Sequence, residues 1–298
     1  MILKDLAALA RPWQWSKNGI LFAGLVFSGH LFDAAYLSRS FLGVLVFCIA
    51  SSLIYTVNDI FDLERDRLHP EKQNRPLASG RVSKTIAILF SVLLFALSVA
   101  GAWTLGRPFL LTLGVFLVLN GAYSLALKQV VILDVMMIAL SFVTRAVAGV
   151  MALRQVDPNL ELSPWLLICT LFLALFLGFG KRRHELRLLA GEASGHRETL
   201  GRYSSAFLDQ LMVIVSSATL IAYAIYTVAP DTVAKFNSTH LVWTVPFVTF
   251  GIFRYLYLIH QRESGGNPSR TLYRDLPLFF SILGWLAAVG IIVYAGRF

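Results

Sequence analysis

The chain has 298 residues, of which 57% are hydrophobic and only 14% are charged, and its mean hydropathy is +0.68. Soluble domains carry about 25% charged residues, so this composition excludes an ordinary soluble enzyme. The formal net charge of +9 would suit a nucleic-acid-binding protein, but the basic residues are distributed as they are in a membrane protein.

Nine apolar runs follow one another along the chain, each close to the ~20 residues that cross a bilayer. We place them at residues 19–36, 40–57, 84–104, 108–126, 131–152, 163–180, 206–229, 241–260 and 275–296. No soluble domain fits between them, so residues 1–298 are expected to form a single all-α membrane bundle. The segment before the first run lacks the ordered regions of a cleavable signal peptide.

The loops between these runs differ in charge. With the N-terminus and every second loop on one side, that side holds 20 of the 26 Lys and Arg residues; the other side holds five, and Arg145 lies within a run. This asymmetry predicts a cytoplasmic N-terminus and an external C-terminus in the cell (inner) membrane. It accounts for the basic excess without a nucleic-acid partner.

A strongly charged segment, NDIFDLERDRLHPEKQNRPLASG, separates the second and third runs. On a helix, Asp59, Asp62 and Asp66 stand within about 60° of one another, whereas Glu64 points to the other face. Three carboxylates on one face repel each other unless a cation lies among them. Mg²⁺ prefers such oxygen ligands, combined with the phosphate oxygens of a substrate. The spacing therefore predicts a metal site.

Two cations, Lys72 and Arg75, follow this acidic turn, in a stretch where Pro70, Pro76 and Gly80 end the helix. A metal beside cations suits a diphosphate, because the metal binds its bridging oxygens and Lys or Arg binds the others. A solvated loop with helix-end charges is the alternative. The common face of the aspartates favours the metal site.

Charged residues near the later runs have two interpretations each. Arg145 lies in the middle of the fifth run, where an uncompensated charge costs about 3 kcal/mol or more, and Asp134 precedes it on a similar side of the helix. Arg145 either bonds to other protein groups or lines a substrate cavity. Asp275, at the start of the last run, is either a helix cap or a ligand.

The pattern NDxxDxxxD from Asn58 to Asp66, followed by KxxRPLxxG from Lys72 to Gly80, resembles the first aspartate-rich motif of the UbiA superfamily of intramembrane prenyltransferases. The stretch YSLALK, from Tyr123 to Lys128, resembles the turn after the fourth helix of that superfamily. The resemblance implies an all-α bundle of about nine transmembrane helices with its polar site at the cytoplasmic end. It also implies that Asp59, Asp62 and Asp66 bind Mg²⁺ and are catalytic.

One departure from that superfamily changes the expected substrate. The loop after the sixth run, Gly180 to Ser204, contains no aspartate, whereas ordinary UbiA prenyltransferases have a second DxxxD motif there. Its many cations should attract a second anion rather than a second metal. The segments RPWQWSKN, LDVMMIALSFVTRAVAG and GKRRHEL resemble decaprenyl-phosphate phosphoribosyltransferases. Those enzymes transfer 5-phosphoribose from phosphoribosyl pyrophosphate (PRPP) to a polyprenyl phosphate.

The resemblance implies a Mg²⁺-dependent transferase with PRPP and a polyprenyl phosphate as substrates. The candidate substrate-binding residues are Lys17, Asn18, Asn58, Lys72, Arg75, Tyr123, Lys128, Asp134, Arg145, Lys181, Arg182, Arg183 and Glu185. One alternative is a prenyltransferase that joins a prenyl diphosphate to an aromatic or glycerol-phosphate acceptor. A membrane transporter is the other. The sequence leaves open whether the chain forms a homo-oligomer.

Overall fold

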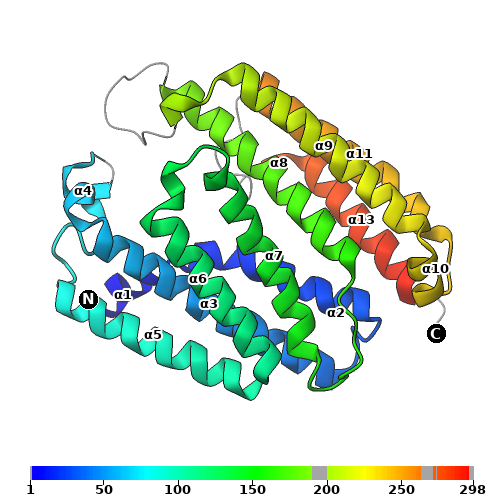
Figure 1. The fold of residues 1–298 in the computed structure, drawn as a ribbon, viewed down its shortest axis with the longest axis horizontal. Helices are drawn as coiled ribbons and strands as arrows, with labels where there is room; N and C mark the ends of the chain where they lie inside the picture. Colours follow the sequence, from blue (N-terminus) through cyan, green and yellow to red (C-terminus); the bar gives the residue numbers. More distant parts are fainter. Residues whose placement is uncertain (1, 71, 190–199, 263–270, 273, 295–298) are drawn as a thin grey trace. The chain divides into compact units, whose positions relative to one another are not determined.

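The computed structural model describes residues 2–70, 72–189, 200–262, 271–272 and 274–294 (Figure 1). Throughout these ranges the chain forms helices and no strand, which confirms the predicted all-α fold. Eight of the described helical segments are long and apolar enough to cross a membrane. The chain divides into two compact units, the first with Met1–Ala126 and Thr144–Leu162 and the second with Leu127–Val143 and Ser163–Phe298.

The first unit is built around one long helix, α3. Its elements, with η marking 3-10 helices, are α1 (Ile2–Ala10), η1 (Pro12–Leu21), α2 (Phe22–Ser28), α3 (Ala34–Phe61), α4 (Leu63–Leu68), η2 (Lys72–Asn74), α5 (Lys84–Thr104), α6 (Arg107–Leu125) and the second half of α7 (Leu133–Leu153). α3 packs most extensively against α5 and also contacts α1, η1 and α6 (Figure 1). The N-terminal segment therefore packs directly on the helix that ends in the acidic motif.

The second unit pairs long helices. Its elements are η3 (Leu127–Gln129), the first half of α7, α8 (Pro164–Leu189), η4 (Leu200–Arg202), α9 (Ser205–Val228), α10 (Pro230–Phe236), η5 (His240–Thr244), α11 (Val245–Gln261) and α13 (Leu276–Tyr294). α8 packs along α9, and α11 packs along α13 (Figure 1). The core between these helices includes Val135, Phe176, Met212, Tyr255 and Leu278.

Short polar side chains cap four of the long helices by accepting a backbone N–H of the first turn, as favoured N-cap residues do. The acceptors are Asp33 before α3, Ser83 before α5, Ser204 before α9 and Asp275 before α13. Asp275, for which the sequence left two roles open, is thus a cap. It also pairs with Arg254, whose hydrogen bonds lower the pKa of the Asp275 carboxyl.

The predicted span at 19–36 is wrong as a single helix. η1 and α2 occupy its first part, the chain turns at Gly29 in a left-handed conformation (φ 81°), and α3 begins only at Ala34. The other eight predicted spans correspond to long helices. The end of η1 packs closely on α7, because a Cβ on Gly149 of α7 would lie 2.0 Å from the carbonyl oxygen of Leu21. Small residues allow this approach in membrane proteins.

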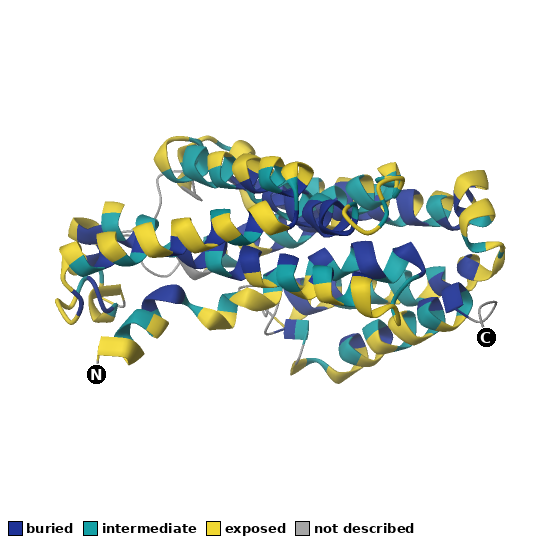
Figure 2. Cartoon of the chain, turned by 90° about the horizontal axis from the view of Figure 1, so that it is seen from below, coloured by how far each residue is buried: buried dark blue, intermediate teal, exposed yellow. Residues whose placement is uncertain are grey.

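The distribution of buried residues is that of a membrane protein. On α5 the large apolar residues Leu89 and Val92 are exposed, whereas the small polar residues Ser91 and Ser98 are buried. Exposed residues follow one side of the long helices and buried residues the other (Figure 2). Lipid tails accept the apolar side chains, while the serine hydroxyls bond to backbone carbonyls within the helix. The chain is therefore an integral membrane protein.

Candidate active site

The acidic motif lies where α3 ends and α4 begins. Asp59 is in the last turn of α3, Asp62 lies between the two helices, and Asp66 is in α4. The expectation of one continuous helix through the three is wrong, because the backbone leaves helical geometry at Asp62 (φ −90°, ψ 5°). Asp59 and Asp66 are nevertheless buried, at 4% and 3% exposure. Glu64 points away from them and is exposed, as its position on the other face predicts.

Two arginines pair with these buried carboxylates. Nη1 of Arg75 lies 2.5 Å from Oδ2 of Asp66 and 3.1 Å from Oδ1 of Asp59, so one guanidinium nitrogen bridges both groups. Nη2 of Arg11 lies 2.5 Å from the same Oδ1 of Asp59. The Arg11 guanidinium also lies 5.2 Å from the centre of the Tyr55 ring. Sequence reasoning missed Arg11, because no spacing links it to a residue 48 positions later.

This donor set suits a cation, although the predicted three-aspartate cluster is not assembled. Across the described parts of the chain, no group of three His, Cys, Asp or Glu side chains is placed to hold a metal ion. Asp59 and Asp66 do converge on one positive group, the Arg75 guanidinium. Two carboxylates completed by phosphate oxygens are a usual environment for Mg²⁺. The pair therefore fits a metal that arrives together with a diphosphate.

Arg145 belongs to a buried polar network of the first unit. Its Nε donates to Oδ1 of Asn18 at 2.8 Å, and its guanidinium lies 4.6 Å from the centre of the Phe116 ring. Nδ2 of Asn18 in turn approaches Oγ of Ser51 at 3.4 Å and Sγ of Cys48 at 3.3 Å. The network joins η1, α3 and α7. Of the two interpretations of Arg145, the structure favours bonding to other protein groups.

In the second unit, Arg182 forms a buried ion pair with the start of α7. Its Nε lies 2.7 Å from Oδ2 of Asp134, and its Nη1 lies 2.5 Å from Oε2 of Glu185. The Tyr203 hydroxyl donates to Oδ1 of Asp134 at 2.7 Å and accepts the N–H of Ile132 at 2.6 Å. Burial raises the pKa of Tyr203, so its hydroxyl keeps the proton that it donates.

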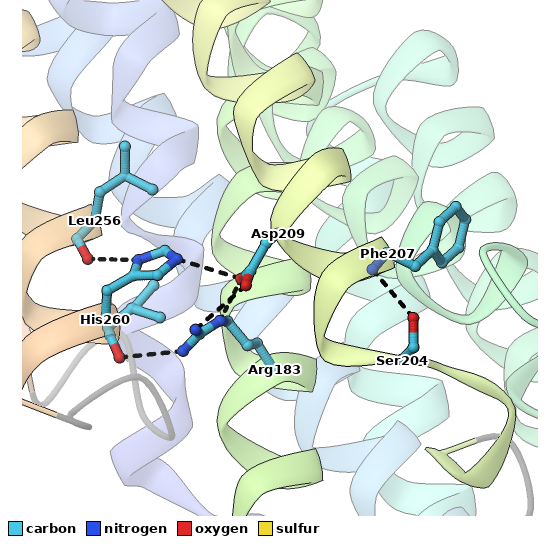
Figure 3. Close-up of polar contacts among 7 residues, drawn as sticks. Arg183, Ser204, Phe207, Asp209, Leu256 and His260 are labelled. Atoms are coloured by element: carbon cyan, nitrogen blue, oxygen red, sulfur yellow. Dashed lines mark hydrogen bonds and ion pairs between the residues drawn. The ribbon is translucent and has the colours of Figure 1, made fainter.

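Arg183 forms a second group with Asp209 and His260, shown in Figure 3. Its guanidinium donates to both carboxylate oxygens of Asp209 and to the carbonyl oxygen of Ile259. Nε2 of His260 lies 3.2 Å from Oδ1 of Asp209, and Nδ1 lies 2.9 Å from the carbonyl oxygen of Leu256. The group therefore joins α8, α9 and α11.

These contacts change the picture of the cation-rich segment. Residues 181–189 were expected in a loop but extend α8, and the arginines at 182 and 183 pair with acids from other helices. Sequence reasoning missed Asp209 and Tyr203, because neither lies in the segment GKRRHEL and no spacing links them to it. Lys181 is exposed, with its Nζ 3.7 Å from Oε1 of Glu185. The stretch 190–199 of the predicted loop, including Arg197, lies outside the described residues.

The other candidates lie in or next to short 3-10 helices or near the ends of long helices. Lys72 is exposed in η2, whereas Asn58 near the end of α3, Tyr123 near the end of α6, Lys17 in η1 and Lys128 in η3 are half-buried.

Comparison with known proteins identifies the family. The model of the UbiA prenyltransferase family matches residues 19–283. The chain belongs to this family. It is 31% identical to the decaprenyl-phosphate phosphoribosyltransferase of Mycolicibacterium smegmatis, over 98% of this chain and 93% of the relative. It is 32% identical to the protein of that name from Mycobacterium tuberculosis, over 96% of this chain and 93% of the relative.

Solved structures agree with a UbiA fold. The structure of a UbiA homolog from Archaeoglobus fulgidus bound to GPP and Mg²⁺ matches with a TM-score of 0.71, at 20% identity, over 97% of this chain and 99% of that chain. The family match confirms the predicted resemblance to the UbiA superfamily, and the solved structure confirms the helical bundle. Family membership makes this UbiA chain a transferase rather than a transporter.

Proposed function

We propose that this UbiA-family chain transfers 5-phosphoribose from PRPP to a polyprenyl phosphate and releases pyrophosphate. The observation that carries the proposal is the similarity along nearly the whole length to two proteins named decaprenyl-phosphate phosphoribosyltransferase. The residues support it, since the acidic motif at Asp59 to Asp66 has no aspartate counterpart between residues 180 and 204. One acidic motif in a chain with many cations suits a substrate pair with a diphosphate and two separate phosphates.

The acidic site of the first unit is the proposed position of the diphosphate. Asp59 and Asp66, with Asp62 at the helix break, would hold Mg²⁺, which neutralises charge on the leaving pyrophosphate when it is bound. Arg75 already lies against both buried carboxylates and can donate to phosphate oxygens from there. Lys72, exposed beside it, is the proposed second cation for the same group.

The transfer itself requires little acid–base catalysis by the protein. A phosphate oxygen of the lipid forms the new bond to C1 of the ribose as the bond from C1 to the pyrophosphate oxygen breaks. The lipid phosphate is anionic at pH 7, so no strong general base is required. Positioning of the two anions and stabilisation of the leaving charge should supply most of the rate.

The cations of the second unit have a divided role in this proposal. Arg182 and Arg183 already pair with acids, so we assign them to holding the ends of α7, α8 and α9 in place. Lys181, exposed on α8, is the proposed contact for the 5-phosphate or the lipid phosphate. Lys17 and Lys128 are further candidates for the same phosphates. In the predicted orientation all of these groups face the cytoplasm.

The test is transfer of label by the purified full-length protein. With PRPP labelled in the ribose, Mg²⁺ and a polyprenyl phosphate, label should enter the lipid fraction while pyrophosphate is released. In a parallel reaction, a labelled prenyl diphosphate is offered together with an aromatic or glycerol-phosphate acceptor. Label transfer only in this second reaction would contradict the proposal and identify an ordinary prenyltransferase. Omission of Mg²⁺ and addition of a chelator provide the control for metal dependence.

A further inference from the structure

Arg11 contributes a charge to the acidic site from outside the acidic motif. It lies at the joint between α1 and η1, and its backbone is left-handed, with φ 52° and ψ 60°. Residues with a side chain rarely adopt this conformation, and a residue before proline, here Pro12, normally prefers an extended one. Disfavoured backbone conformations cluster at functional sites, and the side chain of this residue pairs with the buried Asp59.

Packing on both sides of the joint imposes this conformation. Before it, Leu9 is buried in a cluster with Leu63, within the acidic motif, and with Leu77, Val82 and Ala87, which follow it. Oγ of Ser52 on α3 donates to the carbonyl oxygen of Ala10 at 2.8 Å. After the joint, Nε1 of Trp15 donates to the same Ser52 hydroxyl at 3.0 Å. The contacts on both sides therefore hold the Arg11 guanidinium in position next to Asp59.

The geometry makes Arg11 a competitor for a metal. Nη2 of Arg11 and Nη1 of Arg75 both contact Oδ1 of Asp59, a carboxylate that is proposed to hold the divalent cation. Arg75 is also held by Asp66 at 2.5 Å, so it has a second carboxylate to retain it. A metal on Asp59 would repel both guanidinium groups, and Arg11 is the one whose ion pair must then be given up.

We infer that Arg11 is an exchangeable counter-ion, which neutralises Asp59 in the empty site and binds a phosphate oxygen of the donor once metal and diphosphate occupy it. This inference rests on the proposed metal-dependent transfer. A guanidinium suits the exchange, because its planar donors match carboxylate and phosphate oxygens equally well. Arg11 would then oppose binding of the metal alone but favour binding of the metal together with the donor.

The experiment measures these two opposite effects separately. Mn²⁺ binding to the purified protein is followed by electron paramagnetic resonance without donor, and the KM for PRPP is measured with Mg²⁺. For Arg11→Gln we expect Mn²⁺ to bind about three- to tenfold more tightly and the KM for PRPP to rise about tenfold, as expected for one charge-assisted hydrogen bond. Arg11→Lys, which keeps the charge but not the planar donors, should fall between Arg11→Gln and the wild type in both measurements.

Arg81→Gln is the matched control. Arg81 also ties α1 to this region: its Nε lies 3.0 Å from Oδ1 of Asp5 and its Nη2 lies 2.8 Å from the carbonyl oxygen of Asn74, so it bonds to groups other than Asp59 and Asp66. We expect it to leave both measurements unchanged. If Arg81→Gln reproduces Arg11→Gln, the effect comes from attachment of α1 and the inference is overturned.

The remaining outcomes are also decisive. If Arg11→Gln weakens the binding of both Mn²⁺ and PRPP, Arg11 only supports Asp59. If neither measurement changes, Arg11 takes no part in the site. Either result overturns the counter-ion role. Tighter Mn²⁺ binding in a protein that does not use PRPP would preserve the role and reject the proposed donor. Failure of both wild type and Arg11→Gln to bind Mn²⁺ would reject the metal site and the counter-ion role with it.

Discussion

In the first unit the acidic residues lie in one short segment, and the arginines that pair with them come from other segments. In the second unit the arginines are neighbours in the sequence, and the aspartates that pair with them come from other helices. Asp59 pairs with Arg11 of the N-terminal segment, and both Asp59 and Asp66 pair with Arg75 of the loop that follows the motif. On α8, Arg182 pairs with Asp134 of α7, and Arg183 pairs with Asp209 of α9. A buried charge is tolerated only with a partner, so each motif needs the opposite sign from elsewhere in its unit.

The two clusters differ in how accessible their arginines are. The side chains of Arg11 and Arg75 are 20% and 29% exposed, whereas those of Arg182 and Arg183 are 2% and 6% exposed. Partly exposed cations can exchange a carboxylate for a substrate phosphate, because water and ligand reach them. A fully buried pair has no such alternative. The comparison predicts a reactive cluster in the first unit and a structural one in the second.

The largest expected effect is the loss of turnover in Asp59→Asn. The amide is nearly the same size but lacks the charge that would hold the metal, so we expect Mg²⁺-dependent pyrophosphate release to fall at least about a thousandfold, with the protein still folded. Glu64→Gln, on the exposed face of the same segment, is the control and should retain activity. Normal activity of Asp59→Asn would remove the metal assignment.

Arg182→Gln should mainly damage stability. It leaves the buried Asp134 carboxylate without its cation, and removal of one partner of a buried pair costs about 3–5 kcal/mol. Thermal unfolding of the detergent-solubilised protein measures this loss. The neighbouring change Lys181→Gln, at an exposed position, should leave the unfolding temperature unchanged. Equal stability of the two variants would contradict the structural role of the second cluster.

Lys181→Gln should instead affect substrate binding. Its ammonium group is exposed on α8, and loss of one charge-assisted hydrogen bond to a phosphate would raise the KM for PRPP or for the lipid phosphate by about tenfold. Steady-state kinetics with each substrate varied in turn distinguishes the two phosphates. Arg187→Gln, at another exposed position of α8, serves as the control. Unchanged KM values for both substrates would place Lys181 among the residues that only orient the chain in the membrane.

Tyr203→Phe should be milder than Arg182→Gln and should change local stability without changing substrate binding. The variant loses the hydrogen bond to Asp134 and leaves the N–H of Ile132 without the Tyr203 hydroxyl, at a cost of about 1–3 kcal/mol. Ile132 has a positive φ of 71°, which is unusual for a β-branched residue, so this bond helps to hold a strained turn. Hydrogen exchange at the start of α7 should increase, while the KM for PRPP stays unchanged. A changed KM with normal exchange would contradict this assignment.

Much of the fold follows from local properties of the sequence. Eight of the nine predicted spans correspond to long helices, because an apolar stretch of about 20 residues in lipid must satisfy its backbone internally and does so as a helix. The acidic motif was located from the spacing of Asp59, Asp62 and Asp66, and its resemblance to the UbiA superfamily is confirmed by the family match. These features require no knowledge of distant contacts.

Tertiary structure alone decided the rest, since it depends on partners far apart in the chain. Within the predicted span at 19–36, Leu21 packs against Gly149 of α7, a contact that no local pattern indicates. Pairing of Arg11 with Asp59 spans 48 positions, and so does pairing of Arg182 with Asp134. The sequence lists the charges of a membrane protein, but only packing determines which cations are neutralised within the protein and which remain available to a phosphate.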